Sequence, residues 1–290
     1  HLELGTVTAR AQAPNPSPNL FRLPRDRALV NRLGFPNEGA DAIAARIEDV
    51  RADIPVPVGV SIGKSRTVPL EPVDGVIADY LASFRAARTR ADFVVINVSS
   101  PNTAGLRSMQ GQELARALLT DLVHENRNAR AGASAAPPVP LLVKIAPDLD
   151  DADLDALLEV VCACELDGVV ATNTTLSRAG LATDASRVAA IGAGGLSGPP
   201  LRARALQIVR RVRRGIGPHR TIIGVGGIAS ADDAMAMMRA GANLVQLYTG
   251  FIYRGPGLVR SIAHGLAEAV ARSGSRSIAD VTRGEWTTVA

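Results

Sequence analysis

Aromatic side chains are scarce in this sequence, at 3% of its 290 residues, and cysteine and histidine are rare. So few rings argue against stacking platforms for single-stranded nucleic acid. The two cysteines, Cys162 and Cys164, lie two positions apart in a helical pattern, where side chains diverge, which argues against a disulfide or a metal role. The four histidines are scattered without metal-ligand spacing, so we expect no metal site.

A large excess of one charge is also absent. The 32 basic and 28 acidic side chains give a net charge of +4, which is too small to predict a nucleic-acid partner. No apolar run approaches the roughly twenty residues of a membrane span, and no signal peptide is visible. The apolar share of 47% and the charged share of 21% are typical of a packed protein with a sizeable core.

Short apolar runs alternate with longer stretches of helical period along nearly the whole chain. The runs cover residues 2–7, 56–62, 93–98, 140–145, 167–172, 221–226 and 243–248. The helical stretches cover residues 39–53, 74–90, 111–131, 151–165, 200–214, 231–240 and 257–272. Nearly continuous apolar runs indicate strands buried on both faces. Strand followed by helix, repeated, predicts right-handed crossovers and a parallel sheet.

These repeats favour a (β/α)₈ barrel, also called a TIM barrel, made by residues 1–290 as a single domain. Seven units are countable and a barrel needs eight. Because the chain begins at His1 rather than at a methionine, we expect the first strand to lie upstream. A doubly wound open sheet is the alternative, since seven parallel strands also suit that fold.

The polar residues that follow each predicted strand should meet at one rim of a barrel, where such folds place their active sites. They include Thr6, Thr8, Ser61, Lys64, Asn97, Ser100, Asn102, Lys144, Thr172, Asn173, Thr174, Tyr248 and Thr249. Asparagine dominates this set, and an amide offers an acceptor and a donor side by side. That pairing matches the edge of a neutral, imide-bearing heterocycle.

Three glycine-rich turns, at residues 192–198, 224–230 and 248–257, follow late strands or open helices. Bare backbone N–H groups in such loops commonly hold a phosphate, so together the turns favour a phosphate-bearing cofactor. Lys144 ends a buried strand and has two readings. It either forms a rim salt bridge with Asp148 or Asp150, or faces an electron-accepting ring as a fixed cation.

Several segments carry a resemblance to one family. They are "ELGTVTARAQ", "LFRLPRDRALVNRLGFPN", "GVSIGKS", "INVSSPNTAGLR", "VKIAPDL", "VVATNTT", "GGLSGPPL", "IIGVGGIAS" and "LVQLYTGFIYRGPGL". With these the sequence resembles dihydroorotate dehydrogenase, the FMN enzyme of pyrimidine synthesis, and in particular its membrane-associated, quinone-using class. Ser100 occupies the place where the soluble classes of the family carry cysteine.

The resemblance implies a role for each matching residue. A serine before proline is by position alone more often a turn residue, but here Ser100 matches the catalytic base, with Thr103 and Phe35 around its proton exit. The implied contacts to dihydroorotate or orotate are Asn31, Arg32, Leu33, Gly34, Phe35, Asn97, Asn102, Asn173 and Thr174. The implied contacts to FMN are Thr6, Ser61, Asn97, Lys144, Thr172, Gly198, Gly226, Gly227, Tyr248 and Thr249.

Two departures from the family pattern stand out. Ser61 replaces the usual asparagine, which loosens or re-routes one flavin hydrogen bond. An upstream strand with an Ala-Ala-Gly turn and a substrate-pairing lysine is not among these residues, nor is the amino-terminal helical segment that binds the membrane and forms the quinone tunnel. We therefore expect these residues alone to be soluble, and their activity without the upstream strand is open.

The resemblance implies oxidation of (S)-dihydroorotate to orotate, with FMN as hydride acceptor and a quinone as final oxidant. It also implies a monomer, peripheral on the cytoplasmic membrane of a bacterium and facing the cytoplasm. Alternatives are a sugar-phosphate isomerase or aldolase on the same barrel, a non-catalytic flavin carrier, and a soluble family member that uses fumarate or NAD.

Overall fold

The computed structural model describes residues 1–102, 106–128 and 137–286. The chain divides into two compact units. The first comprises residues 1–17, 33–145 and 150–168, and the second comprises residues 18–32, 146–149 and 169–290. The single domain expected from the sequence stays a prediction.

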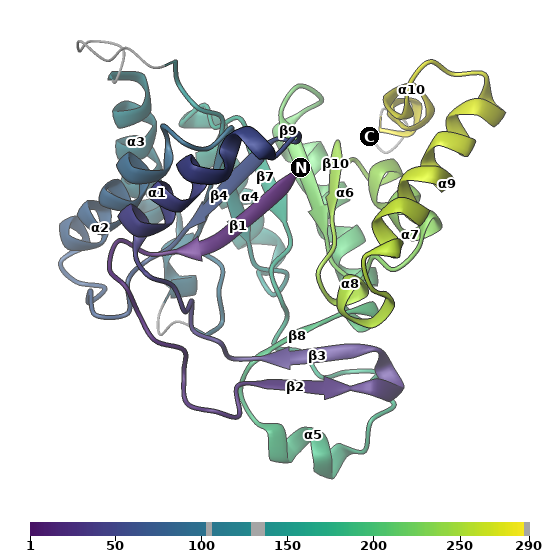
Figure 1. The fold of residues 1–290 in the computed structure, drawn as a ribbon, viewed down its shortest axis with the longest axis horizontal. Coiled ribbons are helices and arrows are strands. Elements are labelled where there is room, and N and C mark those ends of the chain that lie inside the picture. Colours follow the sequence, from purple (N-terminus) through teal and green to yellow (C-terminus); the bar gives the residue numbers. More distant parts are fainter. Residues whose placement is uncertain (103–105, 129–136, 287–290) are drawn as a thin grey trace. The chain divides into compact units, whose positions relative to one another are not determined.

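The first unit contains four parallel strands in the order β1 (Leu2–Val7), β4 (Val58–Ile62), β5 (Phe93–Asn97) and β6 (Leu141–Ile145). Every residue of β4 and β5 is buried, which explains their continuous apolar sequence. The helices that follow these strands are α1 (Ala40–Val50), α2 (Val73–Ala87), α3 (Gln112–Asn128) and α4 (Asp151–Ala163). Each packs on the next, and Figure 1 shows α1, α2 and α3 on one side of these strands.

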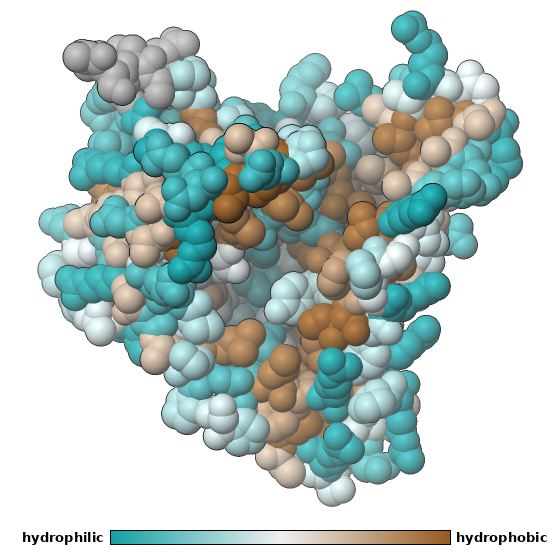
Figure 2. All heavy atoms as spheres, in the orientation of Figure 1, coloured by the Kyte–Doolittle hydropathy of each residue, from teal (hydrophilic) through white to brown (hydrophobic). Residues whose placement is uncertain are grey.

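These helices form because their apolar residues recur on one face. In α4 the buried stripe is Leu154, Leu157, Leu158 and Val161, as the sequence predicts. Asp150 caps the same helix, because its carboxylate accepts a hydrogen bond from the N–H of Asp153 at 2.8 Å. Hydrophilic side chains prevail over the outer surfaces of α1 and α2 in Figure 2, which is the solvent face of that amphipathic pattern.

The second unit contains β7 (Gly168–Ala171), β9 (Thr221–Val225) and β10 (Leu244–Gln246) in that order, and β10 pairs with β9 in parallel. Its helices are α5 (Ala185–Ile191), α6 (Arg202–Ile216), α7 (Ala231–Arg239), α8 (Thr249–Arg254), α9 (Gly257–Ser273) and α10 (Ile278–Thr282). Within each unit the strand order follows the chain order. A doubly wound sheet reverses its order at a switch point, so this order favours the barrel.

A small antiparallel sheet in the second unit was not predicted. It is formed by β2 (Leu20–Leu23), β3 (Ala28–Asn31) and β8 (Gly195–Ser197), and Figure 1 shows β2 and β3 side by side near α5. Leu23, Val30, Ile191 and Leu196 form its own apolar core. Strands of three or four residues are too short to show a periodic signal, which is why they were missed.

The residues that follow α9, as far as Trp286, pack onto a buried arginine. Arg213 is 5% exposed and donates to the carbonyl oxygens of Gly217 and Gly241 at 2.6 and 2.7 Å. Burial lowers the pKa of Arg213 to about 10, and the charge of Arg283 acts in the same direction. The ring of Trp286 lies 4.4 Å from the guanidinium and so anchors the residues that follow α9.

Candidate functional site

The carboxyl ends of β1, β4 and β5 are joined by one hydrogen-bond network in the first unit. The side-chain amide of Asn97 donates to the hydroxyl of Thr6 at 2.8 Å, and the hydroxyls of Thr6 and Ser61 lie 3.2 Å apart. The amide oxygen of Asn97 accepts from the N–H of Ser99 at 3.1 Å and from its hydroxyl at 2.9 Å. Three residues predicted from sequence, Thr6, Ser61 and Asn97, are therefore in contact.

Gly5 allows β1 and β4 to approach closely beneath this network. Its φ is +121°, and a Cβ at this position would lie 2.5 Å from the carbonyl oxygen of Ser61. Any side chain would force the two strands apart, so the glycine of the "ELGTVT" segment is required for the Thr6–Ser61 contact.

Ser100 lies three residues beyond the end of β5 and is 3% exposed. Its hydroxyl oxygen accepts a hydrogen bond from the N–H of Asn102 at 3.2 Å, which fixes the turn around Pro101. Thr103, the expected relay partner, lies outside the described residues. A buried hydroxyl in this place can act as a base only if its proton is passed onward.

The loop that carries Leu33, Gly34 and Phe35 is fixed by three polar contacts. The carbonyl oxygen of Leu33 accepts from the N–H of Asn15 at 2.9 Å. The carbonyl oxygen of Gly34 accepts from the side chain of Gln12 at 2.7 Å. The side chain of Asn37 donates to the carbonyl oxygen of Phe35 at 2.8 Å.

The ring of Phe35 lies close to Gly63, where an added Cβ would be 3.1 Å from its Cε2 and 2.6 Å from the methyl of Thr6. Phe35 is thus positioned beside the strand-end network. Its φ of +54° places the residue in the left-handed region, which a bulky side chain adopts only where its surroundings require it.

A set of buried polar residues supports the strand-end network from behind. Tyr80 of α2 is fully buried, and its phenol donates to the carbonyl oxygen of Asn97 at 2.9 Å. The carboxylate of Asp79 accepts from the N–H of Ser65 at 2.7 Å. The ammonium of Lys64, which is 3% exposed, donates to the carbonyl oxygens of Ser65, at 3.0 Å, and Val68. Burial lowers the pKa of Lys64, and the charge of Asp79 opposes that shift.

The sequence contained a signal for this support, which was missed. Asp79 occupies an inward-facing position of α2, among Val76, Tyr80 and Phe84. A carboxylate is rarely buried unless it has a partner. That position therefore indicated a polar contact beneath the rim.

Replacing Tyr80 by phenylalanine should reveal a pH-dependent contribution to stability. Burial raises the pKa of Tyr80, the backbone of Lys64 opposes this, and the charge of Asp79 adds to it. At neutral pH we expect Tyr80→Phe to lower the free energy of unfolding by about 1–3 kcal/mol, through the lost hydrogen bond to Asn97. The pKa of Tyr80 is higher in the folded protein than its unfolded value of about 10, so the protonated phenol contributes its full stabilisation only below about pH 10. The wild type loses this stabilisation as the pH rises further.

The difference in unfolding free energy between wild type and Tyr80→Phe should therefore narrow above about pH 10. Denaturant titrations between pH 8 and pH 11 measure it. A difference that stays constant over this range would contradict the assignment.

Lys144, at the carboxyl end of β6, forms an ion pair that neither sequence reading named. Its ammonium lies 3.0 Å from a carboxylate oxygen of Glu3 on β1. The two side chains are only 18% and 10% exposed. The predicted salt bridge of Lys144 with Asp148 or Asp150 is therefore wrong in its partner. Lys144 pairs with Glu3, and Asp150 caps α4 instead. The charged partner is 141 positions away in the chain, so local spacing could not reveal it.

In the second unit, the loop after β7 is folded on its own polar side chains. The hydroxyl of Thr172 donates to the carbonyl oxygen of Asn173 at 2.9 Å, and the amide oxygen of Asn173 accepts from the N–H of Thr174 at 2.7 Å. Asp148 fixes the next residues, since it accepts from the hydroxyl of Thr175 and from the N–H of Leu176 at 2.9 Å. The loop is therefore ordered by hydrogen bonds within the unit.

Asn31 and Arg32 end the small sheet. The side chain of Asn31 donates to the carbonyl oxygen of Gly195 at 3.5 Å. The guanidinium of Arg32 donates to the carbonyl oxygens of Ile191 and Ala193 at 2.6 and 2.9 Å, and it lies 4.6 Å from the centre of the Phe21 ring. These contacts show Arg32 joining the sheet to the end of α5.

The three predicted glycines of the second unit sit where a side chain would not fit. At Gly198 an added Cβ would lie 2.8 Å from the carbonyl oxygen of Arg27. At Gly226 it would lie 2.8 Å from the Cβ of Ala205, and at Gly227 it would lie 2.6 Å from the Cβ of Arg202. All three have positive φ angles, of +105°, +141° and +72°. Glycine is therefore required at each position.

A small cavity of the second unit is lined by Gly198, Gly227 and Gly250, together with Arg27 and Arg254. Nearby, the hydroxyl of Thr249 donates to that of Ser197 at 2.8 Å, and Tyr248 is 62% exposed. Backbone N–H groups without side chains, next to two arginines, form a donor set that suits a phosphate. Glycine turns and arginines are residue types that bind phosphate, so this cavity is the candidate phosphate site of the second unit.

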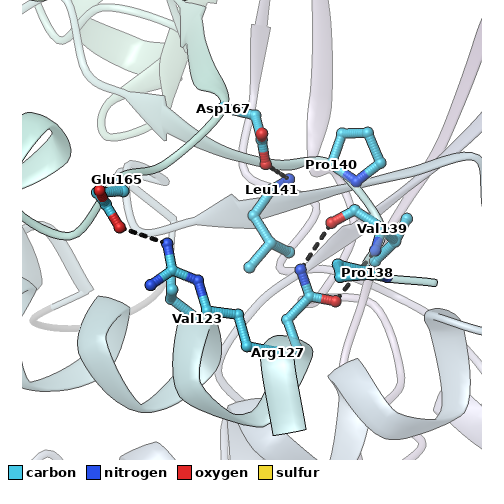
Figure 3. Close-up of a pocket in the computed structure, with 9 residues that line it drawn as sticks. Val123, Arg127, Pro138, Val139, Pro140, Leu141, Glu165 and Asp167 are labelled. Carbon is cyan, nitrogen blue, oxygen red and sulfur yellow. Dashed lines mark hydrogen bonds and ion pairs between the residues drawn. The ribbon is translucent and has the colours of Figure 1, made fainter. Parts of the chain in front are cut away.

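A second pocket lies at the opposite end of β6 from Lys144. Figure 3 shows its lining, where Arg127 pairs with Glu165 and the carboxylate of Asp167 accepts from the N–H of Leu141. The distances are 2.6 and 2.7 Å. This is the amino end of the strand, which in parallel barrels serves stability rather than catalysis. None of the predicted site residues lines it.

The part of the chain that the structure describes contains no group of three or more side chains that could hold a metal ion, and neither Cys162 nor Cys164 forms a disulfide there. Among those same residues, no helix is both long enough and apolar enough to cross a membrane.

Comparison with known proteins gives a consistent family. A family model described as dihydroorotate dehydrogenase matches residues 1–270. The chain is 50% identical to a "Dihydroorotate dehydrogenase (quinone)" from Thermobifida fusca, over 97% of this chain and 73% of that protein. It is 52% identical to one from Clavibacter michiganensis, over 92% of this chain and 74% of that protein.

A solved structure of the Eimeria tenella enzyme in complex with ferulenol superposes with a TM-score of 0.85 at 33% identity. The match covers 96% of this chain and 77% of that one. The ligand-free form gives the same TM-score, over 97% of this chain and 80% of that one. This likeness confirms the predicted α/β barrel class.

Proposed function

Because this chain belongs to the dihydroorotate dehydrogenase family, we propose that it oxidises (S)-dihydroorotate to orotate with FMN as hydride acceptor and a quinone as final oxidant. The observation that carries the proposal is the buried Ser100 directly after the Asn97–Thr6–Ser61 network. Asn97, Ser100 and Asn102 lie at and just after the end of β5, and the half-buried Phe35 lies beside Thr6 of the same network. Ser100 is the buried group that we propose takes a proton there, since Glu38, the carboxylate of the Phe35 loop, is 59% exposed and pairs with Arg46.

Substrate recognition falls to amides in this proposal. The proposed substrate contacts Asn97, Asn102 and Asn173 carry side-chain amides, the group that can donate to ring C=O groups and accept from ring N–H groups. Asn97 is held on both sides, by Tyr80 through its backbone and by Thr6 and Ser99 through its side chain. Such a fixed amide binds a ring edge without first losing its own freedom.

Ser100 is proposed to remove the proton from ring carbon 5. Its burial excludes bulk water, so the proton must leave through neighbouring hydroxyl groups, for which Thr103 is the proposed relay and Phe35 the proposed wall. The hydrogen bond from the N–H of Asn102 orients the hydroxyl oxygen. When bound, FMN would supply the chemistry that these side chains lack, as the acceptor of the hydride from carbon 6 and the donor of electrons to the quinone.

The proposed FMN contacts are divided by chemistry. Thr6, Ser61, Asn97 and Lys144 offer the hydroxyl, amide and ammonium groups that suit a flavin ring. Gly198, Gly226, Gly227, Tyr248 and Thr249 border the anion-suited glycine turns, and Thr172 lies at the end of β7. Arg32 is retained as a substrate contact through its backbone, since its guanidinium is engaged by carbonyl oxygens.

Family membership at about half identity over nearly the whole chain decides against a sugar-phosphate isomerase or aldolase. Because the relatives named above carry the word quinone in their names, we favour a quinone over fumarate or NAD. Because quinones reside in the lipid phase, we further propose that the protein works peripherally on the cytoplasmic face of the bacterial membrane. We also propose that it is a monomer.

An oxidant comparison tests this assignment. The full-length protein with bound FMN is supplied with dihydroorotate and, in turn, with ubiquinone and menaquinone analogues, fumarate and NAD, and orotate formation is followed. We expect turnover with at least one quinone and none with fumarate or NAD. Turnover with fumarate or NAD alone would place the protein in a soluble class of the family.

A further inference from the structure

The ion pair between Glu3 and Lys144 crosses the inner face of the first unit's sheet. The strand order β1-β4-β5-β6 separates the two residues by two strands. The strand register places Asn97 beside Lys144. The alternation of side chains along each strand then puts Glu3, Ser61, Asn97 and Lys144 on the same face. The carboxylate thus reaches the lysine from the face that carries the strand-end network.

Folding stability gives little reason for this pair. Two charges whose side chains are 18% and 10% exposed lose most of their hydration, and apolar replacements of such pairs are often neutral or stabilising. The register partner of Glu3 is Gly59, whose missing side chain leaves room for the ring of Phe93, 2.1 Å from where a Cβ would stand. The strand face beside Glu3 is therefore filled by the ring of Phe93, and the carboxylate of Glu3 is held by its contact with Lys144.

We infer that Glu3 is a positioning residue for Lys144 that sets the electron affinity of the flavin, an inference that rests on the FMN-dependent function proposed above. A lysine beside the flavin favours the reduced ring, which gains negative charge. Glu3 fixes the position of that ammonium and offsets part of its charge. The pair keeps the flavin low enough in potential to pass its electrons onward while Lys144 still assists the hydride step.

The midpoint potential of bound FMN tests the inference in the full-length protein. Glu3→Gln removes the offsetting charge, and its amide oxygen can still accept a hydrogen bond from the Lys144 ammonium. We expect the potential to rise by about 30 mV, which corresponds to a tenfold change in the two-electron equilibrium. Lys144→Met should shift it in the opposite direction. Glu3→Asp keeps the charge but withdraws the carboxylate by one methylene, so it should give a smaller rise and provides a second variant if Glu3→Gln does not fold.

Glu38→Gln is the matched control. Glu38 also forms an ion pair, with Arg46, but its side chain is 59% exposed. The same chemical change at Glu38 should therefore leave the midpoint potential of FMN unaltered. A midpoint potential that is unchanged or lowered in Glu3→Gln would overturn the inference. If only Glu3→Asp folds, an unchanged potential in that variant would overturn it. A purely structural pair would lower thermal stability without moving the potential. Wild-type protein that binds no FMN would refute the proposed function instead.

Discussion

Replacing Ser100 by alanine is expected to slow reduction of the bound flavin by dihydroorotate by about two to four powers of ten, the typical loss of a general base. The hydroxyl is buried and lies directly after the strand-end network, where a substrate carbon held by Asn97 would meet it. The change also takes the acceptor from the N–H of Asn102, so the flavin content of the variant is measured as the check that the turn keeps its shape. Anaerobic stopped-flow absorbance of the flavin measures the rate directly.

Two variants complete this experiment. Ser99→Ala makes the same chemical change one residue earlier and removes a hydroxyl that donates to Asn97 at 2.9 Å, so it should cost stability but far less rate. Ser100→Cys restores an ionisable group and should recover part of the rate, with a pH profile moved toward the thiol. Flavin reduction at the wild-type rate in Ser100→Ala would rule Ser100 out as the base.

Replacing Gly227 by alanine is expected to weaken FMN binding by at least about tenfold. A non-glycine residue with a φ of +72° costs about 1–2 kcal/mol, and the new Cβ would stand 2.6 Å from the Cβ of Arg202 and 3.0 Å from its Cα. Because α6 begins at Arg202, the turn that borders the anion-suited cavity must move instead. Fluorescence titration of the apoprotein with FMN measures the loss.

Gly217→Ala is the control for this prediction. Gly217 has nearly the same φ, of +73°, but no atom lies within 4 Å of an added Cβ. It should carry the same backbone cost without displacing the turn, so thermal stability should fall in both variants and FMN affinity only in Gly227→Ala. Equal FMN affinities in the two variants would show that the turn does not hold the phosphate.

The long buried strands and their helices could be predicted from sequence because their signals are local. The runs at 93–98 and 140–145 correspond to β5 and β6, and the stripe of α4 follows its predicted positions. The run at 243–248 shortens to Leu244–Gln246, since strand ends depend on pairing partners. The predicted helix at 111–131 ends at Asn128 among the described residues.

The features that sequence could not supply are those that depend on contacts far apart in the chain. The small sheet joins β3 to β8, whose residues lie more than 160 positions apart, as the 164-position separation of Asn31 and Gly195 shows. In the sequence Glu3 is an ordinary strand residue, and only the folded sheet brings its carboxylate to Lys144 of β6. The inward-facing position of Asp79 in α2 indicated a polar contact, but only the packing of α2 shows that Asp79 holds Ser65 and that Tyr80 holds Asn97.

Anaerobic mixing of the full-length, FMN-loaded protein with dihydroorotate is the most direct measurement of the central claim. The absorbance of oxidised flavin should disappear as one equivalent of orotate forms, and a quinone analogue added afterwards should restore it. Flavin that stays oxidised in the presence of saturating dihydroorotate would contradict the account.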